Sequence, residues 1–312
     1  MIIASIAITA RIAAAAVAIR QECVASRITE VNGSPLAVAC YFRLMTVVLI
    51  TGGSSGIGLA TVRRLAEAGD QVFSASRTPA SVPLAGNVTH VPLDLADPRA
   101  CEAAVRSVAD SAGRLDVLIN NAGTAVLAPL EEGGDAEAYR TFEVNVFGPM
   151  RLIRAALPVM RAQGAGRIIN VTSVNDIAMA PFGGWYSASK AALASLSMVL
   201  GAELHGSGIF VTVVAPGLFV TGMSEQLPFA RVATDSRYAG AFEKLRAESA
   251  MELATAGDPD EVARALAECI ASAAPPARIV VGADGIAMDA TVRNATAEDL
   301  ASMLRDYVAS LK

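Results

Sequence analysis

Tyr186 and Lys190 are four positions apart in a stretch of helix-forming residues. This spacing puts a phenol and an ammonium on one face of a helix, one turn apart. A free phenol has a pKa near ~10, too high for ready proton exchange at neutral pH, and an adjacent cation lowers that pKa. We therefore expect Lys190 to lower the pKa of Tyr186, which would act as a general acid and base. An exposed helical pair without chemistry is the alternative.

A glycine-rich turn provides a second group of candidate residues, in the segment Thr-Gly-Gly-Ser-Ser-Gly-Ile-Gly between an apolar run and a helical one. In such a turn the backbone amides and the positive end of the following helix face a diphosphate, and the glycines let it approach. The expected cofactor contacts come from Gly52, Ser54, Ser55, Gly56, Ile57 and Gly58. A tight connection that binds no ligand is the alternative.

The same turn also satisfies Gly-x-Ser-x-Gly, the nucleophile elbow of serine hydrolases, with Ser54 as the nucleophile. Such a serine needs a histidine later in the chain and an acid to orient that histidine. The two histidines, His90 and His205, have no obvious acidic partner, and the turn follows the first expected strand rather than a later one. A hydrolase is therefore a less favoured interpretation.

Ser76 and Arg77 follow the second expected strand, where a carboxylate would bind the ribose hydroxyls of NAD and a basic residue would accept the 2′-phosphate of NADP. Residues 71–93 contain no Asp or Glu. The sequence therefore predicts NADP(H), with NAD(H) less favoured; an ordinary solvated arginine is the alternative for Arg77. After the third expected strand, Asp94 and Leu95 are candidates for the adenine edge, although Asp94 would serve equally to cap the next helix.

From Thr46 onward, short β-branched runs alternate with helical stretches. The expected strands are nearly continuous in apolar residues, as in strands buried on both faces, and cover 46–50, 71–75, 88–93, 115–119, 167–171, 209–214 and 278–281. The expected helices cover 57–68, 97–112, 139–162, 185–204 and 259–272. This alternation predicts an α/β fold: a single domain with a Rossmann-type doubly wound parallel sheet in three α/β/α layers.

Two segments stand outside this alternation. Residues 1–44 form an extension before the expected domain at 45–312, and we favour an extension upstream of a start at Met45 over a targeting peptide. Their longest uncharged stretch is too short to span a bilayer, so no membrane span is expected. Residues 218–256 have mixed polarity and are expected to form a substrate lid.

The composition restricts the function classes. With 53% hydrophobic and 18% charged residues, the 312-residue chain can bury one large core. A net charge of −5 without a basic stripe argues against a nucleic-acid partner. The four cysteines are far apart, which favours reduced thiols and a cytoplasmic location, and two histidines leave few ligands for a catalytic zinc, so we expect no metal.

Taken together, the motifs resemble those of the short-chain dehydrogenase/reductase family, over nearly the whole stretch from Thr46 to Val281. The glycine turn is similar to the family's Thr-Gly-x-x-x-Gly-x-Gly. Further matches are Asn120, Asn121, Ala122 and Gly123 after the fourth expected strand, Asn145, Ser173 thirteen residues before Tyr186, Lys190, Pro216 and Gly217. Thr221 is one position late for the family's nicotinamide-binding threonine.

The resemblance implies an oxidoreductase acting on CH–OH donors that interconverts a ketone or an aldehyde and its alcohol with NADP(H). Tyr186 would transfer the proton, Ser173 would hold the substrate oxygen, and Lys190 would bind the cofactor ribose. Asn145 would hold a water that links Lys190 to solvent. Cofactor contacts would come from Asn121, Ala122, Gly123, Tyr186, Lys190, Pro216 and Gly217. A dinucleotide-binding redox sensor without catalysis is a further alternative.

The resemblance also implies a homodimer or homotetramer that pairs through the helices at 139–162 and 185–204. Apolar residues in the expected lid suggest a pocket roof, although they would equally pack on the sheet: Leu218, Phe219, Met223, Leu227, Phe229 and Tyr238. Pro181, Phe182 and Trp185 support the same interpretation. The layout is similar to the steroid- and retinol-acting branch of the family, which favours a small-molecule substrate that is a bulky apolar ketone.

Overall fold

The computed structural model describes residues 45–221, 229 and 232–311. Its described residues contain a parallel sheet in the order β3-β2-β1-β4-β5-β6-β7. The strands are β1 (Val47–Thr51), β2 (Gln71–Ser76), β3 (Val88–Pro92), β4 (Val117–Asn120), β5 (Gly166–Val171), β6 (Ile209–Pro216) and β7 (Arg278–Val281). The order runs outward in both directions from β1 and β4, so the topological switch point lies between these two strands.

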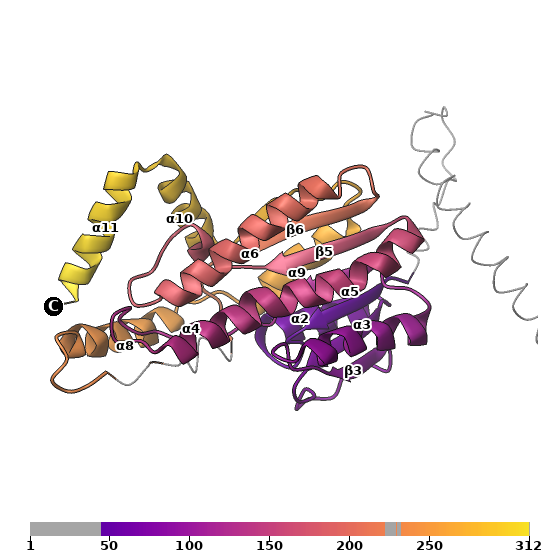
Figure 1. Ribbon diagram of the computed structural model, residues 1–312, viewed down its shortest axis with the longest axis horizontal. Coiled ribbons are helices and arrows are strands. Elements are labelled where there is room, and N and C mark those ends of the chain that lie inside the picture. The colour runs from indigo at the N-terminus through magenta and orange to yellow at the C-terminus, as the bar shows by residue number, and fades with distance from the viewer. Residues whose placement is uncertain (1–44, 222–228, 230–231, 312) are drawn as a thin grey trace, which may run out of the picture. The chain divides into compact units, whose positions relative to one another are not determined.

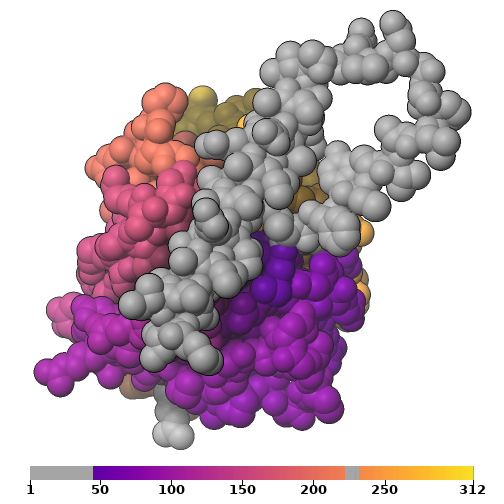
Figure 2. All heavy atoms as spheres, turned by 90° about the vertical axis from the view of Figure 1, so that its right-hand side faces the viewer, coloured from indigo at the N-terminus to yellow at the C-terminus, as the bar shows by residue number. Residues whose placement is uncertain are grey.

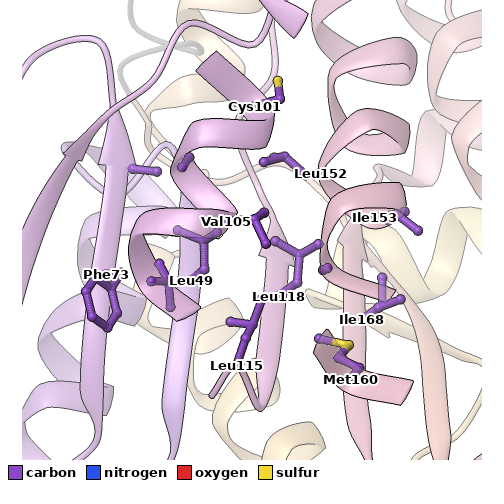
Figure 3. Packing of buried hydrophobic residues seen from close by; sticks show 14 of the residues in the cluster. Leu49, Phe73, Cys101, Val105, Leu115, Leu118, Leu152, Ile153, Met160 and Ile168 are labelled. Atoms are coloured by element: carbon purple, nitrogen blue, oxygen red, sulfur yellow. The ribbon is translucent and has the colours of Figure 1, made fainter. Parts of the chain in front are cut away.

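Helices cover both faces of the sheet in three layers (Figure 1). One face carries α3 (Pro98–Ala112), α5 (Gly148–Gln163) and the C-terminal part of α6 (Gly184–Glu203), which pack on Leu49 and Leu118 (Figure 3). The other face carries α2 (Gly56–Glu67) and α9 (Pro259–Ala271), which pack on Val48 and Ile50. The side chains of neighbouring residues in β1 thus point into hydrophobic cores on opposite faces of the sheet, which is why the strand is apolar throughout. The predicted fold class is confirmed.

The two edge strands depart from the expected continuous burial. Every residue of β1 is buried, whereas β3 and β7 each contain one buried residue. An edge strand has one neighbour in the sheet and is covered less by the helices, so polar residues such as Thr89 and His90 are tolerated in β3.

The single helix expected at 139–162 is three elements. The structure has α4 (Asp135–Phe142), a π-helical turn η2 (Glu143–Phe147) and then α5. Pro149 has no N–H to donate to the carbonyl of Asn145 four residues earlier, so the regular helical ladder is interrupted here. The wider turn changes the direction in which the side chain of Asn145 projects, and Asn145 is buried there.

Three helices were not expected from the sequence: α8 (Ala239–Leu253), α10 (Ala283–Asn294) and α11 (Ala297–Ser310). α8 lies within the expected lid, of which residues 222–228, 230 and 231 are outside the described residues, as is the extension 1–44. Leu311, directly after α11, packs with Phe242 and Leu245 of α8. Figure 1 shows α8 and α11 together at the left end of the molecule.

No helix in the described part of the chain combines the length and the apolar composition needed to cross a bilayer.

Candidate active site

Four parallel strands end at one edge of the sheet, and each is followed by one of the sequence motifs. The glycine turn follows β1, the Asn120–Gly123 segment ends β4, Ser173 follows β5, and Pro216 ends β6. Ligands of open parallel sheets bind beyond the carboxyl ends of the strands, near the switch point. The fold therefore brings these motifs to one place.

Ser173 and Tyr186 are the candidate reactive residues at this edge of the sheet. Ser173 is the N-cap of the short 3₁₀ helix η3 (Val174–Asp176), and its hydroxyl accepts a hydrogen bond from the amide of Asn175 at 3.2 Å. Tyr186 lies in the first turn of α6, which packs against η3. The side chain of Ser173 lies close enough to the phenol of Tyr186 to lower the pKa of that group. The two residues, thirteen positions apart in the chain, are thus brought together by the fold.

The pKa of Tyr186 is raised above its ordinary value, the opposite of the expected direction. Burial is the main cause, because the surrounding protein disfavours the phenolate, and the negative charge of Asp176 adds to it. The nearby side chain of Ser173 opposes this shift. Lys190 lies with its Nζ over the Tyr186 ring, 5.7 Å from the ring centre.

Lys190 is a buried ammonium group at the end of β5. Its Nζ donates to the carbonyl of Val171 at 3.0 Å. Burial lowers the pKa of Lys190 to about 8, and the charge of Asp176 opposes that shift. At neutral pH the group is therefore mainly an ammonium, close to its titration point.

Asn145 joins three elements through its side chain. Its Oδ1 accepts from the amide of Thr124 at 2.8 Å, and its Nδ2 donates to the carbonyl of Thr124 at 2.8 Å and to Ser189 Oγ at 2.9 Å. Both amide hydrogens are therefore used, and any water at this side chain must bind through Oδ1. The contacts make Asn145 a residue that holds η2, the loop after β4 and α6 together.

The glycine turn has the geometry of a phosphate cradle. Gly52 and Gly56 have φ values of +71° and +51°, which favour glycine. A Cβ on Gly58 would lie 2.1 Å from the carbonyl oxygen of Gly52, so no side chain fits there. Within the described chain, Ser55 makes no side-chain capping bond to α2, which leaves the first amides of that helix facing outward. These features fit the diphosphate of a nicotinamide dinucleotide.

Thr51 ties the glycine turn to the segment after β4. Its hydroxyl accepts from the amides of Asn121 and Ala122, both at 3.0 Å, and its carbonyl accepts from Asn121 Nδ2 at 2.9 Å. The motif residue Asn120 instead pairs with Asn170 inside the sheet at 2.8 Å. Asn121 and Ala122 thus lie at the turn, and Gly123 is the next residue along the chain.

The candidate adenosine residues differ in their surroundings. Ser76 Oγ donates to the carbonyl of Thr78 at 2.6 Å and lies 3.2 Å from His90 Nε2, and Arg77 is exposed. Asp94 is exposed and accepts from the amide of Ala96 at 3.0 Å.

The helix after β3 is capped by Asp97, which accepts from Arg99, so the capping role considered for Asp94 is wrong. The side chain of Leu95 is buried beneath Gly148, so its backbone alone is available to a ligand.

Asp284 supports the segment after β6 and had not been singled out in the sequence. Its Oδ2 accepts from the amide of Leu218 at 2.7 Å, and a Cβ on Gly217 would lie 2.4 Å from its carboxylate. Gly217 is therefore required by a close approach. Thr221 lies against Gly56 of the glycine turn. The signal for Asp284 in the sequence was the short turn after the last strand, which brings α10 beside Gly217.

The expected pocket roof is built from fewer residues than the sequence suggested. Phe219 is 3% exposed and packs in the sheet core with α9, so it does not form a roof. Phe229, Tyr238 and Phe242 cluster with Phe182, with ring centres 5.5 to 6.0 Å apart in edge-to-face contacts. An open hollow of about 600 Å³ lies beside Phe229 and Phe242. Met223 and Leu227 lie outside the described residues.

The chain is similar to proteins of known class. A family model described as short chain dehydrogenase matches residues 46–231. The 3-ketodihydrosphingosine reductase of Bacteroides thetaiotaomicron is 33% identical over 237 residues, which cover 76% of this chain and 87% of that protein.

Two solved structures add fold evidence. A short chain dehydrogenase/reductase from Burkholderia phymatum in complex with NAD has a TM-score of 0.67 at 26% identity, covering 80% of this chain and 92% of that one. A short chain dehydrogenase from Burkholderia cenocepacia in complex with NADP has a TM-score of 0.64 at 27% identity, covering 83% of this chain and 97% of that one. With these matches and the site described above, the chain belongs to the short-chain dehydrogenase family of oxidoreductases.

Proposed function

We propose that this protein is an NADP(H)-dependent oxidoreductase that interconverts a ketone or an aldehyde and its alcohol, with Tyr186 as the general acid and base. The observation that carries the proposal is the placement of Ser173 near the phenol of Tyr186, with the buried ammonium of Lys190 over the ring of that tyrosine. A redox sensor would have no use for an acid at this position. A hydrolase would need a histidine base beside Ser54, whereas His90 contacts Ser76 and His205 follows the end of α6.

Each residue has a defined part in the reduction. The nicotinamide, when bound, supplies a hydride to the carbonyl carbon. Ser173 donates a hydrogen bond to the carbonyl oxygen, and Tyr186 transfers its proton to that oxygen as negative charge develops. The raised pKa of Tyr186 keeps the phenol protonated at neutral pH, as a general acid requires.

The oxidation of an alcohol places the opposite demand on Tyr186. The phenol must first lose its proton, and the ammonium of Lys190 is the nearby cation that stabilises the phenolate. Asn145 holds α6 against the loop after β4 and thereby fixes the register of both residues.

NADP(H) is the proposed cofactor, with NAD(H) less favoured. Arg77 is exposed at the end of β2, beside Ser76, where a 2′-phosphate would be bound. The other proposed contacts are Gly52, Ser54, Ser55, Gly56, Ile57 and Gly58 to the diphosphate, Asp94 and the Leu95 backbone to the adenine, and Asn121, Ala122, Gly123, Tyr186, Lys190, Pro216 and Gly217 to the ribose and nicotinamide. Thr221 is a further candidate, since it lies against Gly56.

A bulky apolar ketone is the proposed substrate class. The aromatic cluster of Phe182, Phe229, Tyr238 and Phe242 connects the approach to Tyr186 with α8. One relative is named as a reductase of 3-ketodihydrosphingosine. We assign the substrate lid to residues 218–256 on this basis.

The proposed assembly is a homodimer or homotetramer in the cytoplasm. Leu196, Met198 and Val199 are exposed on α6, and Phe147 is exposed beside α5. Apolar side chains gathered on such helices favour pairing with a second copy. Light scattering coupled to size-exclusion chromatography tests the proposed assembly, and a monomer at micromolar concentration would contradict it.

The decisive experiment is Tyr186→Phe. The purified protein is incubated with NADPH and a panel of ketones and aldehydes, and cofactor absorbance is followed. The variant should bind NADPH as the wild type does but turn over ~10²-fold to 10⁴-fold more slowly, the usual cost of losing a general acid. Tyr139→Phe, at an exposed position of α4, is the matched control and should leave the rate unchanged. Turnover near wild type in the Tyr186 variant contradicts the assignment.

A further inference from the structure

Asp176 is a fully buried carboxylate three residues after Ser173, and the proposed mechanism gives it no part. Thr172 Oγ1 donates to its Oδ2 at 2.8 Å. Arg278 of β7 holds both carboxylate oxygens, through Nη1 to Oδ2 at 2.6 Å and Nη2 to Oδ1 at 2.8 Å. A buried charge is costly unless it is paired in this way.

The pairing of Asp176 continues outward as a chain of alternating charges. Arg278 also contacts Asp289 of α10 at 3.3 Å, and Asp289 binds Arg293 of the same helix at 2.6 Å. The positive charge of Arg278 is therefore shared between two carboxylates, so it does not neutralise Asp176 alone. Asp176 keeps part of its negative field inside the site.

That field acts on the two groups of α6 that face η3. Lys190 donates to the carbonyl of Val171, the residue next to Thr172, which binds Asp176. The negative charge of Asp176 favours the ammonium form of Lys190 and disfavours the phenolate of Tyr186. The charged groups around Asp176 are thus Lys190 with the titratable Tyr186 on α6, Arg278 on β7, and Asp289 with Arg293 on α10.

We propose that Asp176 is a positioning residue of the active site, which keeps Lys190 in its ammonium form and fixes the turn that carries Ser173. The first part follows from burial: without a nearby anion, burial would lower the pKa of this lysine further. The second follows from the hydrogen bonds, because Thr172 and Arg278 fasten the end of η3, whose first position is capped by Ser173.

The test measures the titration of Lys190 directly, in the protein without cofactor or substrate. The sequence has three lysines, Lys190, Lys244 and Lys312, so ¹³C-labelled lysine gives few side-chain signals by NMR. The Lys190 signal is assigned from its loss in Lys190→Met, and the other two lysines serve as internal references. Asp176→Asn should lower the pKa of Lys190 by about one unit or more.

Asp289→Asn is the matched control, because Asp289 lies on the far side of Arg278 from the site. The pKa of its Lys190 should change much less than in Asp176→Asn, because the carboxylate of Asp176 is still present. If Asp176→Asn does not fold, the double variant Asp176→Asn with Arg278→Gln replaces the ion pair by two amides that can still hydrogen-bond. The double variant should also lower the pKa of Lys190, but by less than Asp176→Asn alone.

An unchanged Lys190 titration in the folded Asp176 variants overturns the proposal. The role of Asp176 rests on the proposed function, but the Lys190 titration needs no turnover. If the protein reduced no carbonyl compound, the proposed function would fail while the effect of Asp176 on the pKa of Lys190 could still be measured. Where the wild type is active, the pH profile of kcat/KM for reduction supplies the second readout. Its alkaline limb should move to lower pH in Asp176→Asn and move much less in Asp289→Asn.

Discussion

Tyr186 and Lys190 respond to burial in opposite directions. Burial raises the pKa of the phenol and lowers that of the ammonium, since the charged form of each group is disfavoured away from water. The ordinary pKa values are 10.0 for the phenol and 10.5 for the ammonium, so burial moves the two apart: the phenol goes up, and the ammonium goes down to about 8. At neutral pH the site therefore holds a protonated phenol, the form that a reduction needs, and an ammonium close to its titration point.

Lys190 should make the stability of the fold depend on pH. Its pKa is 10.5 in the unfolded chain and about 8 in the fold, so between these values the unfolded state binds more protons and stability rises with pH. Lys190→Met has no group that titrates at this position, so its stability lacks this rise with pH. The difference in free energy of unfolding, wild type minus Lys190→Met, should increase by roughly 3 kcal/mol from about pH 7 to about pH 10.5.

Urea titrations at several pH values provide this measurement. The matched control is Lys244→Met, which removes an exposed lysine of α8 and should differ from the wild type by the same amount at every pH. A wild-type advantage over Lys190→Met that stays constant with pH would show that the ammonium is not destabilised by burial.

Arg77 should decide the choice of dinucleotide. Removing a charged hydrogen-bond donor to a phosphate costs about 1.5 to 3 kcal/mol, or roughly 10-fold to 100-fold in affinity. Arg77→Ala should therefore raise the KM for NADPH by that factor and leave the KM for NADH nearly unchanged. Steady-state kinetics with both cofactors measure this, and Arg106→Ala, an exposed arginine of α3, is the control. Equal effects on both cofactors would remove Arg77 from the phosphate site.

At the scale of elements, local patterns were predictable and long-range consequences were not. The boundaries of β1, the glycine turn and α2 were predicted to within one residue, because apolar runs and glycine positions are visible in the local sequence. The π turn around Asn145 was missed: Pro149 marks the interruption locally, but the bonds of Asn145 to Thr124 and Ser189, which hold the turn, form only on folding. α8 and α10 have little amphipathic pattern, so periodicity gave no signal for them.

The site shows the same division. The residue types and the spacing of Tyr186 and Lys190 pointed to proton transfer, and the family resemblance added Ser173. Asp176 had no signal, because the partner that allows its burial, Arg278, lies 102 positions away. The raised pKa of Tyr186 was missed for a related reason: the sequence shows the neighbouring cation but not the depth of burial.

The glycine turn gives a prediction for an element. Gly58→Ala would put a Cβ 2.1 Å from the Gly52 carbonyl, so the turn must shift and the affinity for NADPH should fall at least ~10-fold, with a stability loss of about 1 to 3 kcal/mol. Gly69→Ala is the control: its φ of +86° makes alanine strained by roughly 1 to 2 kcal/mol, yet nothing lies within 4 Å of the new Cβ. It should lose stability without losing NADPH affinity, as measured by fluorescence titration and urea melts.

Across the whole molecule, strand order separates the early and late parts of the chain. β1, β2 and β3 occupy one side of the sheet and β5, β6 and β7 the other, so the indigo and the pink-to-orange segments lie on different sides of the face in Figure 2. The active-site edge is the place where both parts meet. The late part then adds α10, whose Asp284 and Asp289 reach back to Gly217 and Arg278.

This organisation predicts that residues 45–312 suffice for folding and catalysis. β1, the third strand in the order of the sheet, begins at Val47, and the sheet and the hydrophobic core clusters of the described residues lie after Met45. A chain that starts at Met45 should unfold in one cooperative transition and reduce the same carbonyl compounds with a comparable kcat. A chain that starts at Gln71 lacks β1 and the glycine turn, and should neither fold nor bind NADPH. Thermal melts followed by circular dichroism, with NADPH turnover on the same samples, distinguish the two; loss of cooperative unfolding in the first chain would place residues 1–44 within the domain.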